Sequence, residues 1–149
     1  YQDRTTWNRD LIHRGFDYLD AAVEHHSFST YHLEAGIASL HAAAPSFEQT
    51  DWKAVYHLYE MLYAVKPAPI VALNKAIASA YAVSKQSALT ALQQIKGLEN
   101  HYLYYASLGE IYYGLNDKAE AKNYFQKALQ LTSSGSEQLL LRYKISNCN

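Results

Sequence analysis

The chain has 149 residues, of which 49% are apolar and 18% charged, and its formal net charge is −1. The apolar fraction excludes a disordered tail, and the short apolar runs argue against a membrane-spanning helix. The near-zero charge argues against a free-standing nucleic-acid binder, which needs a basic surplus to neutralise phosphates. We therefore expect one soluble domain with a single core.

The cysteine content bears on the cellular compartment. Cys148 is the single cysteine, so the sequence contains neither a disulfide framework nor a thiolate cluster for zinc. This favours a reducing, cytoplasmic location. The chain opens on Tyr1 with no initiator Met or signal peptide, and we expect it to be part of a longer protein.

The apolar residues recur at spacings of three and four, interrupted by six glycines and three prolines, which predicts about eight helices joined by short turns. The first is expected over residues 5–25, with Asp3 as its cap. The second is expected over residues 31–43, before Pro45. Thr50 should cap the third by accepting a hydrogen bond, with Asp51 near the positive end of its dipole. Its buried face is predicted to contain Trp52, Val55, Tyr59 and Leu62.

The second half of the chain predicts five further helices. Pro69 suits the first turn of the fourth helix, and Ser84 can cap the fifth. The sixth and seventh are expected over residues 101–115 and 118–132, and a short last helix over residues 139–145.

The sixth and seventh helices carry the most specific pattern in the chain, which is the spacing of a tetratricopeptide repeat. Small residues allow the two helices to approach, Asn116 tolerates the left-handed turn between them, and residues 117–120 form a capping box. The expected repeat-packing residues are Tyr105, Leu108, Gly109, Tyr112, Ala121, Phe125 and Ala128.

A weaker copy of this pattern lies 33 residues upstream and includes Ala76, Ala88 and Leu92. Because a helix pair leaves one apolar face open, neighbouring pairs must stack, which predicts an all-α superhelical array with a concave groove. We divide it into an N-terminal helix pair (1–45), degenerate repeats (46–100), the best-matching repeat (101–135) and a C-terminal capping helix (136–149).

Further motifs resemble the carboxy-terminal, tetratricopeptide-like extension of extracytoplasmic-function sigma factors of bacterial RNA polymerase. The resemblance spans nearly the whole chain, and its motifs are specific together and not singly. They are Gln2-Asp3-Arg4 with Trp7, Tyr31 with Leu33, Ala35 and Ile37 before His41-Ala42, Thr50-Asp51-Trp52, Leu58-Tyr59, and Val71-Ala72-Leu73-Asn74-Lys75-Ala76. The sequence departs from the family at Ser29-Thr30, where Gly-Pro is usual, and at Lys75, where Arg is usual. An ammonium at residue 75 makes a weaker anion contact than a guanidinium fork.

The resemblance implies that the sigma regions that bind core polymerase and read the promoter precede Tyr1, and that this chain is regulatory. Its implied partners are those sigma regions and RNA polymerase, with a regulatory protein as a further candidate, and neither direct DNA binding nor membrane association. The alternative is a generic tetratricopeptide scaffold that binds an unrelated protein or peptide.

Nine residues are candidates for partner binding or interdomain docking: Gln2, Asp3, Arg4, Trp7, Tyr31, Asp51, Trp52, Asn74 and Lys75. The first four form either a helix cap with an aromatic staple or a docking surface. Asn74 and Lys75 are either a polar clamp between helices or the floor of a binding groove. The 14 tyrosines divide between core packing and a surplus suited to protein recognition.

The sequence offers no pattern typical of catalysis. The seven histidines lack the three- or four-residue spacing of helical metal sites, and no nucleophile elbow or glycine-rich phosphate loop occurs. Carboxylate pairs such as Asp17 and Asp20 lie on polar helix faces. We therefore predict a non-enzymatic domain without metal or cofactor.

Overall fold

The computed structural model describes residues 30–149, which form seven α-helices and no β-strand. The helices are α2 (Thr30–Ala43), α3 (Trp52–Val65), α4 (Pro69–Ala82), α5 (Lys85–Gln93), α6 (Tyr102–Gly114), α7 (Lys118–Leu131) and α8 (Gly135–Ser146). The expected all-helical, helix-hairpin architecture is thereby confirmed. The helix predicted over residues 5–25 lies outside the described residues.

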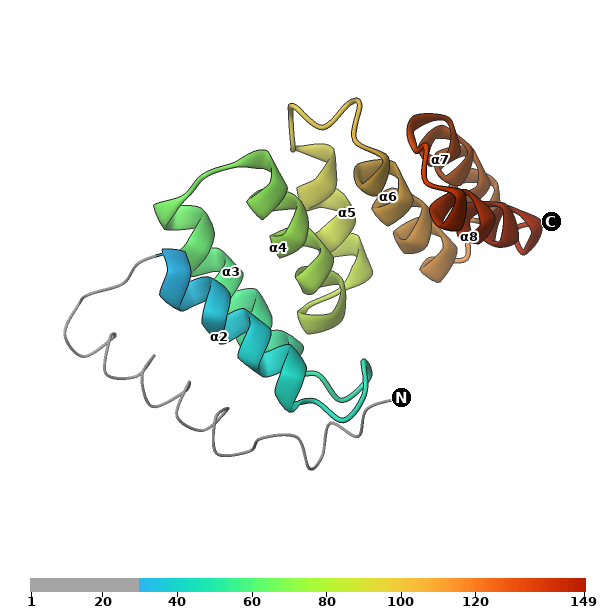
Figure 1. The fold of residues 1–149 in the computed structure, drawn as a ribbon. Coiled ribbons are helices and arrows are strands. Elements are labelled where there is room, and N and C mark those ends of the chain that lie inside the picture. The colour runs from blue at the N-terminus through green and yellow to red at the C-terminus, as the bar shows by residue number, and fades with distance from the viewer. Residues whose placement is uncertain (1–29) are drawn as a thin grey trace.

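Successive helices lie side by side, so the array advances from α2 to α8 in chain order (Figure 1). Each helix packs mainly against the helices before and after it in sequence, and the most extensive contact joins α6 to α7. The α3–α4 and α5–α6 connections both lie along the upper edge in this view. No helix within residues 30–149 combines the length and apolar character needed to cross a bilayer.

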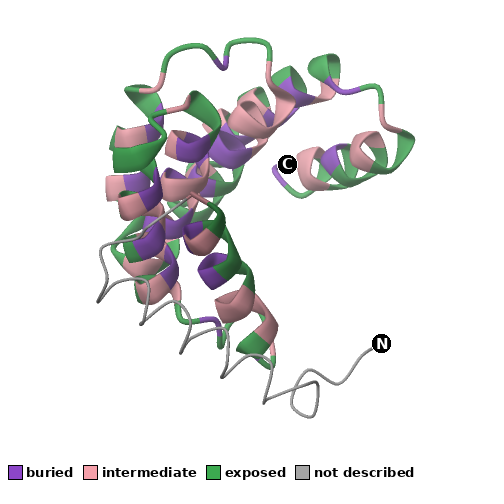
Figure 2. Cartoon of the chain, turned by 60° about the vertical axis from the view of Figure 1, so that its left-hand side comes forward, coloured by how far each residue is buried: buried purple, intermediate pink, exposed green. Residues whose placement is uncertain are grey.

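The buried side chains form three clusters that follow one another along the array. One joins α2, α3 and α4 around Leu33, Val55 and Leu62. The next joins α4, α5 and α6 around Leu73 and Leu92, and the third joins α7 to α8 around Phe125. Buried segments accordingly face neighbouring helices, whereas exposed ones lie outside and in the connections (Figure 2). The core is thus divided into successive clusters along the array, as expected for stacked helix pairs.

The start of α3 differs from the expectation. Asp51, and not Thr50, caps the helix, because its Oδ1 accepts a hydrogen bond from the Ala54 amide at 3.2 Å. Thr50 is buried and its hydroxyl instead donates to the Ser46 carbonyl at 3.2 Å, closing the preceding turn. The buried face of α3 also includes Leu58, whereas Trp52 and Tyr59 are only half-buried.

The start of α8 was also wrongly placed, since the helix begins at Gly135 and not at residue 139. Gly135 and Ser136 are weak helix formers, which is why the sequence pattern begins later. Glu137 offsets this weakness, because its carboxylate accepts hydrogen bonds from the Tyr102 hydroxyl at 2.6 Å and from the Thr132 hydroxyl. A tertiary contact to α6 therefore supports the first turn of α8.

Candidate functional site

The α6–α7 hairpin places the seven repeat-packing residues in and around its interface. Gly109 is buried against Phe125, and a Cβ atom added to it would stand 2.6 Å from two ring carbons. Ala121, Phe125 and Ala128 are at most 1% exposed. Asn116 adopts the expected left-handed conformation with φ of 65°, and Asp117 caps α7 by accepting from the Glu120 amide. The sequence therefore encodes a close approach of the two helices.

Tyrosines fill the seam where this hairpin joins α5. Tyr112 stacks on Tyr124 with ring centroids 5.4 Å apart, and Tyr124 stacks on Tyr105 at 6.4 Å. The Tyr104 hydroxyl donates to the Leu92 carbonyl of α5 at 3.0 Å. Burial, followed by neighbouring acidic and phenolic groups, raises the pKa of Tyr104 and Tyr124. These tyrosines therefore contribute to packing between the helices.

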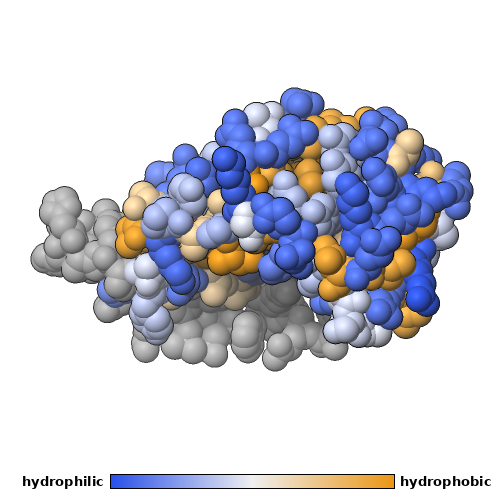
Figure 3. Space-filling model, turned by 90° about the horizontal axis from the view of Figure 1, so that it is seen from above, coloured by the Kyte–Doolittle hydropathy of each residue, from blue (hydrophilic) through white to orange (hydrophobic). Residues whose placement is uncertain are grey.

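A groove of about 470 Å³ crosses α3, α4 and α5. Its sides are formed by Tyr56 and Tyr63 of α3 and by the α5 end, and Lys75 of α4 lies within it. The Lys75 ammonium is 5.2 Å from the centroid of the Tyr63 ring, within cation–π range. Figure 3 shows the molecule from above, where apolar patches are interrupted by hydrophilic side chains.

A second surface feature is an aromatic cluster at the opposite end of α3. Trp52 stacks on Tyr81 of α4 with centroids 4.5 Å apart, and both rings contact Phe47 at about 5 Å. The Trp52 Nε1 donates to the Phe47 carbonyl at 3.3 Å, and His41 of α2 meets Trp52 edge-on at 5.5 Å. Phe47 is 53% and Tyr81 50% exposed, so this aromatic cluster presents ring faces to its surroundings.

The five docking candidates within residues 30–149 do not converge on one site. Lys75 lies in the groove, and Trp52 lies in the aromatic cluster at the other end of α3. Tyr31 is 72% exposed on α2, Asn74 is half-buried on α4, and Asp51 is used as the α3 cap. Gln2, Asp3, Arg4 and Trp7 lie outside the described residues.

Lys96 and Tyr81 are among the residues of these surfaces that the sequence did not indicate. Lys96 lines the groove from the segment after α5, and Tyr81 forms the stacking partner of Trp52. Neither lies in a motif, because each is brought into place by helix packing. If the repeat pattern is continued toward the N-terminus, it predicts that α3, α4 and α5 lie side by side. This is the signal from which the groove could have been predicted.

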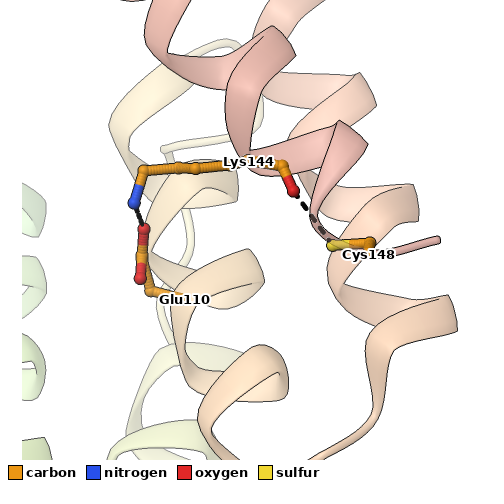
Figure 4. Close-up of polar contacts among 3 residues, drawn as sticks. All are labelled: Glu110, Lys144 and Cys148. Carbon is orange, nitrogen blue, oxygen red and sulfur yellow. Dashed lines mark hydrogen bonds and ion pairs between the residues drawn. The ribbon is translucent and has the colours of Figure 1, made fainter.

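The last helix, α8, makes a separate polar contact with α6 at the C-terminal end of the array. Lys144 of α8 forms an ion pair with Glu110 of α6, and its ammonium is 5.8 Å from the Phe125 ring centroid (Figure 4). On the other side of α8, the Cys148 thiol donates to the Lys144 carbonyl at 3.3 Å. Burial lowers the pKa of Lys144. These contacts fix α8 against the repeat hairpin.

A metal centre needs several side chains that can bind the ion together. Within residues 30–149 no group of three or more His, Cys, Asp or Glu side chains is placed to hold a metal ion. His57 instead lies 4.0 Å from Glu60 on an exposed face of α3, and His101 caps α6 through its Nδ1. His57 and His101 therefore take part in local contacts of α3 and α6.

These features define a class of protein, which is a stacked array of helix hairpins. Residues 102–134, comprising α6, α7 and the turn between them, match the tetratricopeptide repeat family. Proteins of this architecture are typically interaction scaffolds and not enzymes, because the stacked helix pairs create extended surfaces for other proteins.

The chain is also similar to a full-length relative. It is 33% identical over 147 residues, or 98% of this chain, to an uncharacterized protein of Rhizobium meliloti (strain 1021). The aligned region covers 35% of that protein. The chain therefore spans about a third of the length of this relative.

Proposed function

We propose that this chain is a protein-interaction scaffold without catalytic activity, and that it recognises its partner through the groove across α3, α4 and α5 and through the aromatic cluster. The observation that carries this proposal is the stacked helix-hairpin array with a tetratricopeptide repeat in α6 and α7. Such arrays present rigid surfaces on which side chains from successive helices act together.

The composition of the two surfaces supports a protein partner. Exposed Tyr, Trp and Phe rings are typical of protein interfaces, because they offer large contact areas and lose little rotamer entropy. Phe47, Trp52 and Tyr81 contact one another and are therefore held in place before binding. Preorganisation of this kind lowers the entropic cost of association.

A finer proposal is that the scaffold is the regulatory, carboxy-terminal part of a bacterial sigma factor, and that it acts in the cytoplasm on promoter-directed initiation. The sequence motifs that support it include Tyr31, the Thr50-Asp51-Trp52 run and the segment containing Asn74 and Lys75. Its partners would then be the sigma regions of the same polypeptide and RNA polymerase, and it would not itself bind DNA. The greater length of the relative leaves room for such regions.

The decisive experiment is a pull-down of this chain against separately purified sigma regions, core polymerase and an unrelated protein mixture. The sigma reading predicts saturable capture of the sigma regions or polymerase. The general scaffold reading predicts capture of another protein only. Trp52→Ala should weaken capture in either case, whereas Lys118→Ala, at an exposed position of α7, should leave it unchanged.

A reporter experiment separates regulation from simple association. Deletion of this region from the intact protein should change output from the target promoter but leave its sequence preference unaltered. A docked scaffold acts through differential affinity for two arrangements of the sigma core, so removal shifts their balance. Equal output at matched protein abundance would remove the regulatory role and leave the scaffold proposal to be judged by the pull-down.

A further inference from the structure

The groove across α3, α4 and α5 differs from the aromatic cluster in its charge. Two lysines line it, Lys75 from the middle of α4 and Lys96 from the segment after α5, and no aspartate or glutamate does. Within residues 30–149 neither lysine forms an ion pair with a carboxylate. The groove is therefore a local cationic site on a chain whose net charge is −1.

Lys75 is held in a defined position. Its side chain is half-buried, and its ammonium faces the Tyr63 ring at 5.2 Å from the centroid. A partly desolvated ammonium gains most from a direct anionic partner, because water screens the charge less at such a site. The structure thus presents a positioned ammonium group that has no carboxylate partner within residues 30–149.

The remaining lining is suited to an extended peptide. Tyr56 and Tyr63 offer aromatic surface, and Pro67 and Pro69 make part of the wall rigid. Burial, with a smaller contribution from Glu60, raises the pKa of Tyr56, so its hydroxyl remains a neutral hydrogen-bond donor. Glu60 itself does not line the groove. Ser87 of α5 and Gln94, which follows the last residue of α5, add uncharged polar side chains.

We infer that this groove binds an extended acidic segment of a protein partner, with carboxylates placed against Lys75 and Lys96 and with apolar or proline side chains against Tyr56 and Tyr63. This inference rests on the proposed scaffold function and specifies the chemistry of its ligand. Carboxylates fit the two ammonium groups, and a preformed extended peptide loses little entropy on entering an aromatic groove.

The test uses the described chain and a labelled peptide in which glutamate alternates with proline, with a matched peptide in which glutamine replaces glutamate. Fluorescence anisotropy at low and physiological salt should show binding of the glutamate peptide that weakens with salt. The glutamine peptide should bind at least about tenfold more weakly, the loss expected when charge-assisted hydrogen bonds are removed.

Variants then locate the binding site. Lys75→Gln and Lys96→Gln should each reduce affinity by several fold, roughly the effect of removing one charged hydrogen bond, and the double variant should reduce it further. Lys96 is exposed, so its substitution leaves the packing of the helices intact. Lys53→Gln and Lys118→Gln, which remove exposed lysines outside the groove, should bind like the parent chain.

Three results would overturn the inference: equal binding of the two peptides, unchanged affinity in both groove variants, or preferential binding of inorganic phosphate or duplex DNA over the acidic peptide. Its failure is distinct from failure of the scaffold proposal. A chain that captures a protein in the pull-down through Trp52 but ignores the acidic peptide keeps the scaffold and loses this ligand. A chain that binds the peptide through its two lysines but captures neither sigma regions nor polymerase loses only the sigma reading.

Discussion

Gly109 of α6 lies directly against the Phe125 ring of α7, since a Cβ atom on Gly109 would overlap that ring at 2.6 Å. The Phe125 side chain is 1% exposed, so it is held within the packed interior of the hairpin. Gly109→Leu should therefore force the helices apart and lower the free energy of unfolding by about 1–3 kcal/mol. Thermal denaturation followed by circular dichroism measures this loss.

Gly135→Ala is the matched control, because an added Cβ there meets nothing within 4 Å. A Gly109→Leu variant that melts with the parent would contradict this packing.

Asn116 provides a backbone test of the same hairpin. Its φ of 65° lies in the left-handed region, which β-branched residues avoid. Asn116→Val should cost about 1–2 kcal/mol, whereas Asn116→Gly should be neutral or slightly stabilising. Urea unfolding of the two variants checks the sign of each change. Equal losses in both would show that the Asn116 side chain, and not its backbone conformation, matters.

Glu137 should make stability depend on pH. Hydrogen bonds from Thr132 and then Tyr102 lower its pKa in the folded state. The hydrogen bond between Tyr102 and Glu137 also raises the pKa of Tyr102. A carboxylate with a lowered folded-state pKa stabilises the fold above its unfolded pKa, and this contribution is lost as pH falls through the folded value. Glu137→Gln should therefore flatten the acid limb of a plot of stability against pH, measured by urea unfolding. Glu48→Gln, at an exposed loop position, should leave that limb unchanged.

The ion pair between Glu110 and Lys144 is accessible to a double-mutant cycle. The side chains are 48% and 30% exposed, so solvent screens much of their attraction. Burial also lowers the pKa of Lys144, which opposes its charged form. We expect a coupling of about 0.2–1 kcal/mol between Glu110→Gln and Lys144→Met, reduced at high salt. A coupling that does not respond to salt would indicate a role for the Lys144 stem against Phe125 instead of the charge.

Local patterns predicted the helices of this chain well, and tertiary contacts account for the differences. The Ser84 and Asp117 caps and the Asn116 turn follow from residue type at a helix end, so sequence alone predicted them. At the start of α3 both Thr50 and Asp51 are residue types that can cap a helix. Asp51 is the cap, because the Thr50 hydroxyl is already hydrogen-bonded to the Ser46 carbonyl.

The surfaces were less predictable than the helices. Lys75 was named as a candidate, but its position over Tyr63 depends on how α3 and α4 pack. Trp52 and Tyr81 are separated by about two helices along the chain and meet only because those helices are antiparallel neighbours. Lys96 lies in a connection with no motif, so only the assembled groove identifies it.

The neighbour-to-neighbour packing of α2 to α8 has a kinetic consequence. Because almost every contact joins segments close in sequence, little chain entropy is lost before the first stabilising contacts form. We expect the α6–α7 hairpin, which has the largest interface and two good turn signals, to nucleate folding, with the other helices adding outward from it. Amide hydrogen exchange should then be slowest in α6 and α7 and faster toward α2. That order would show that the α6–α7 hairpin is the most stable part of the array, onto which the other helices fold.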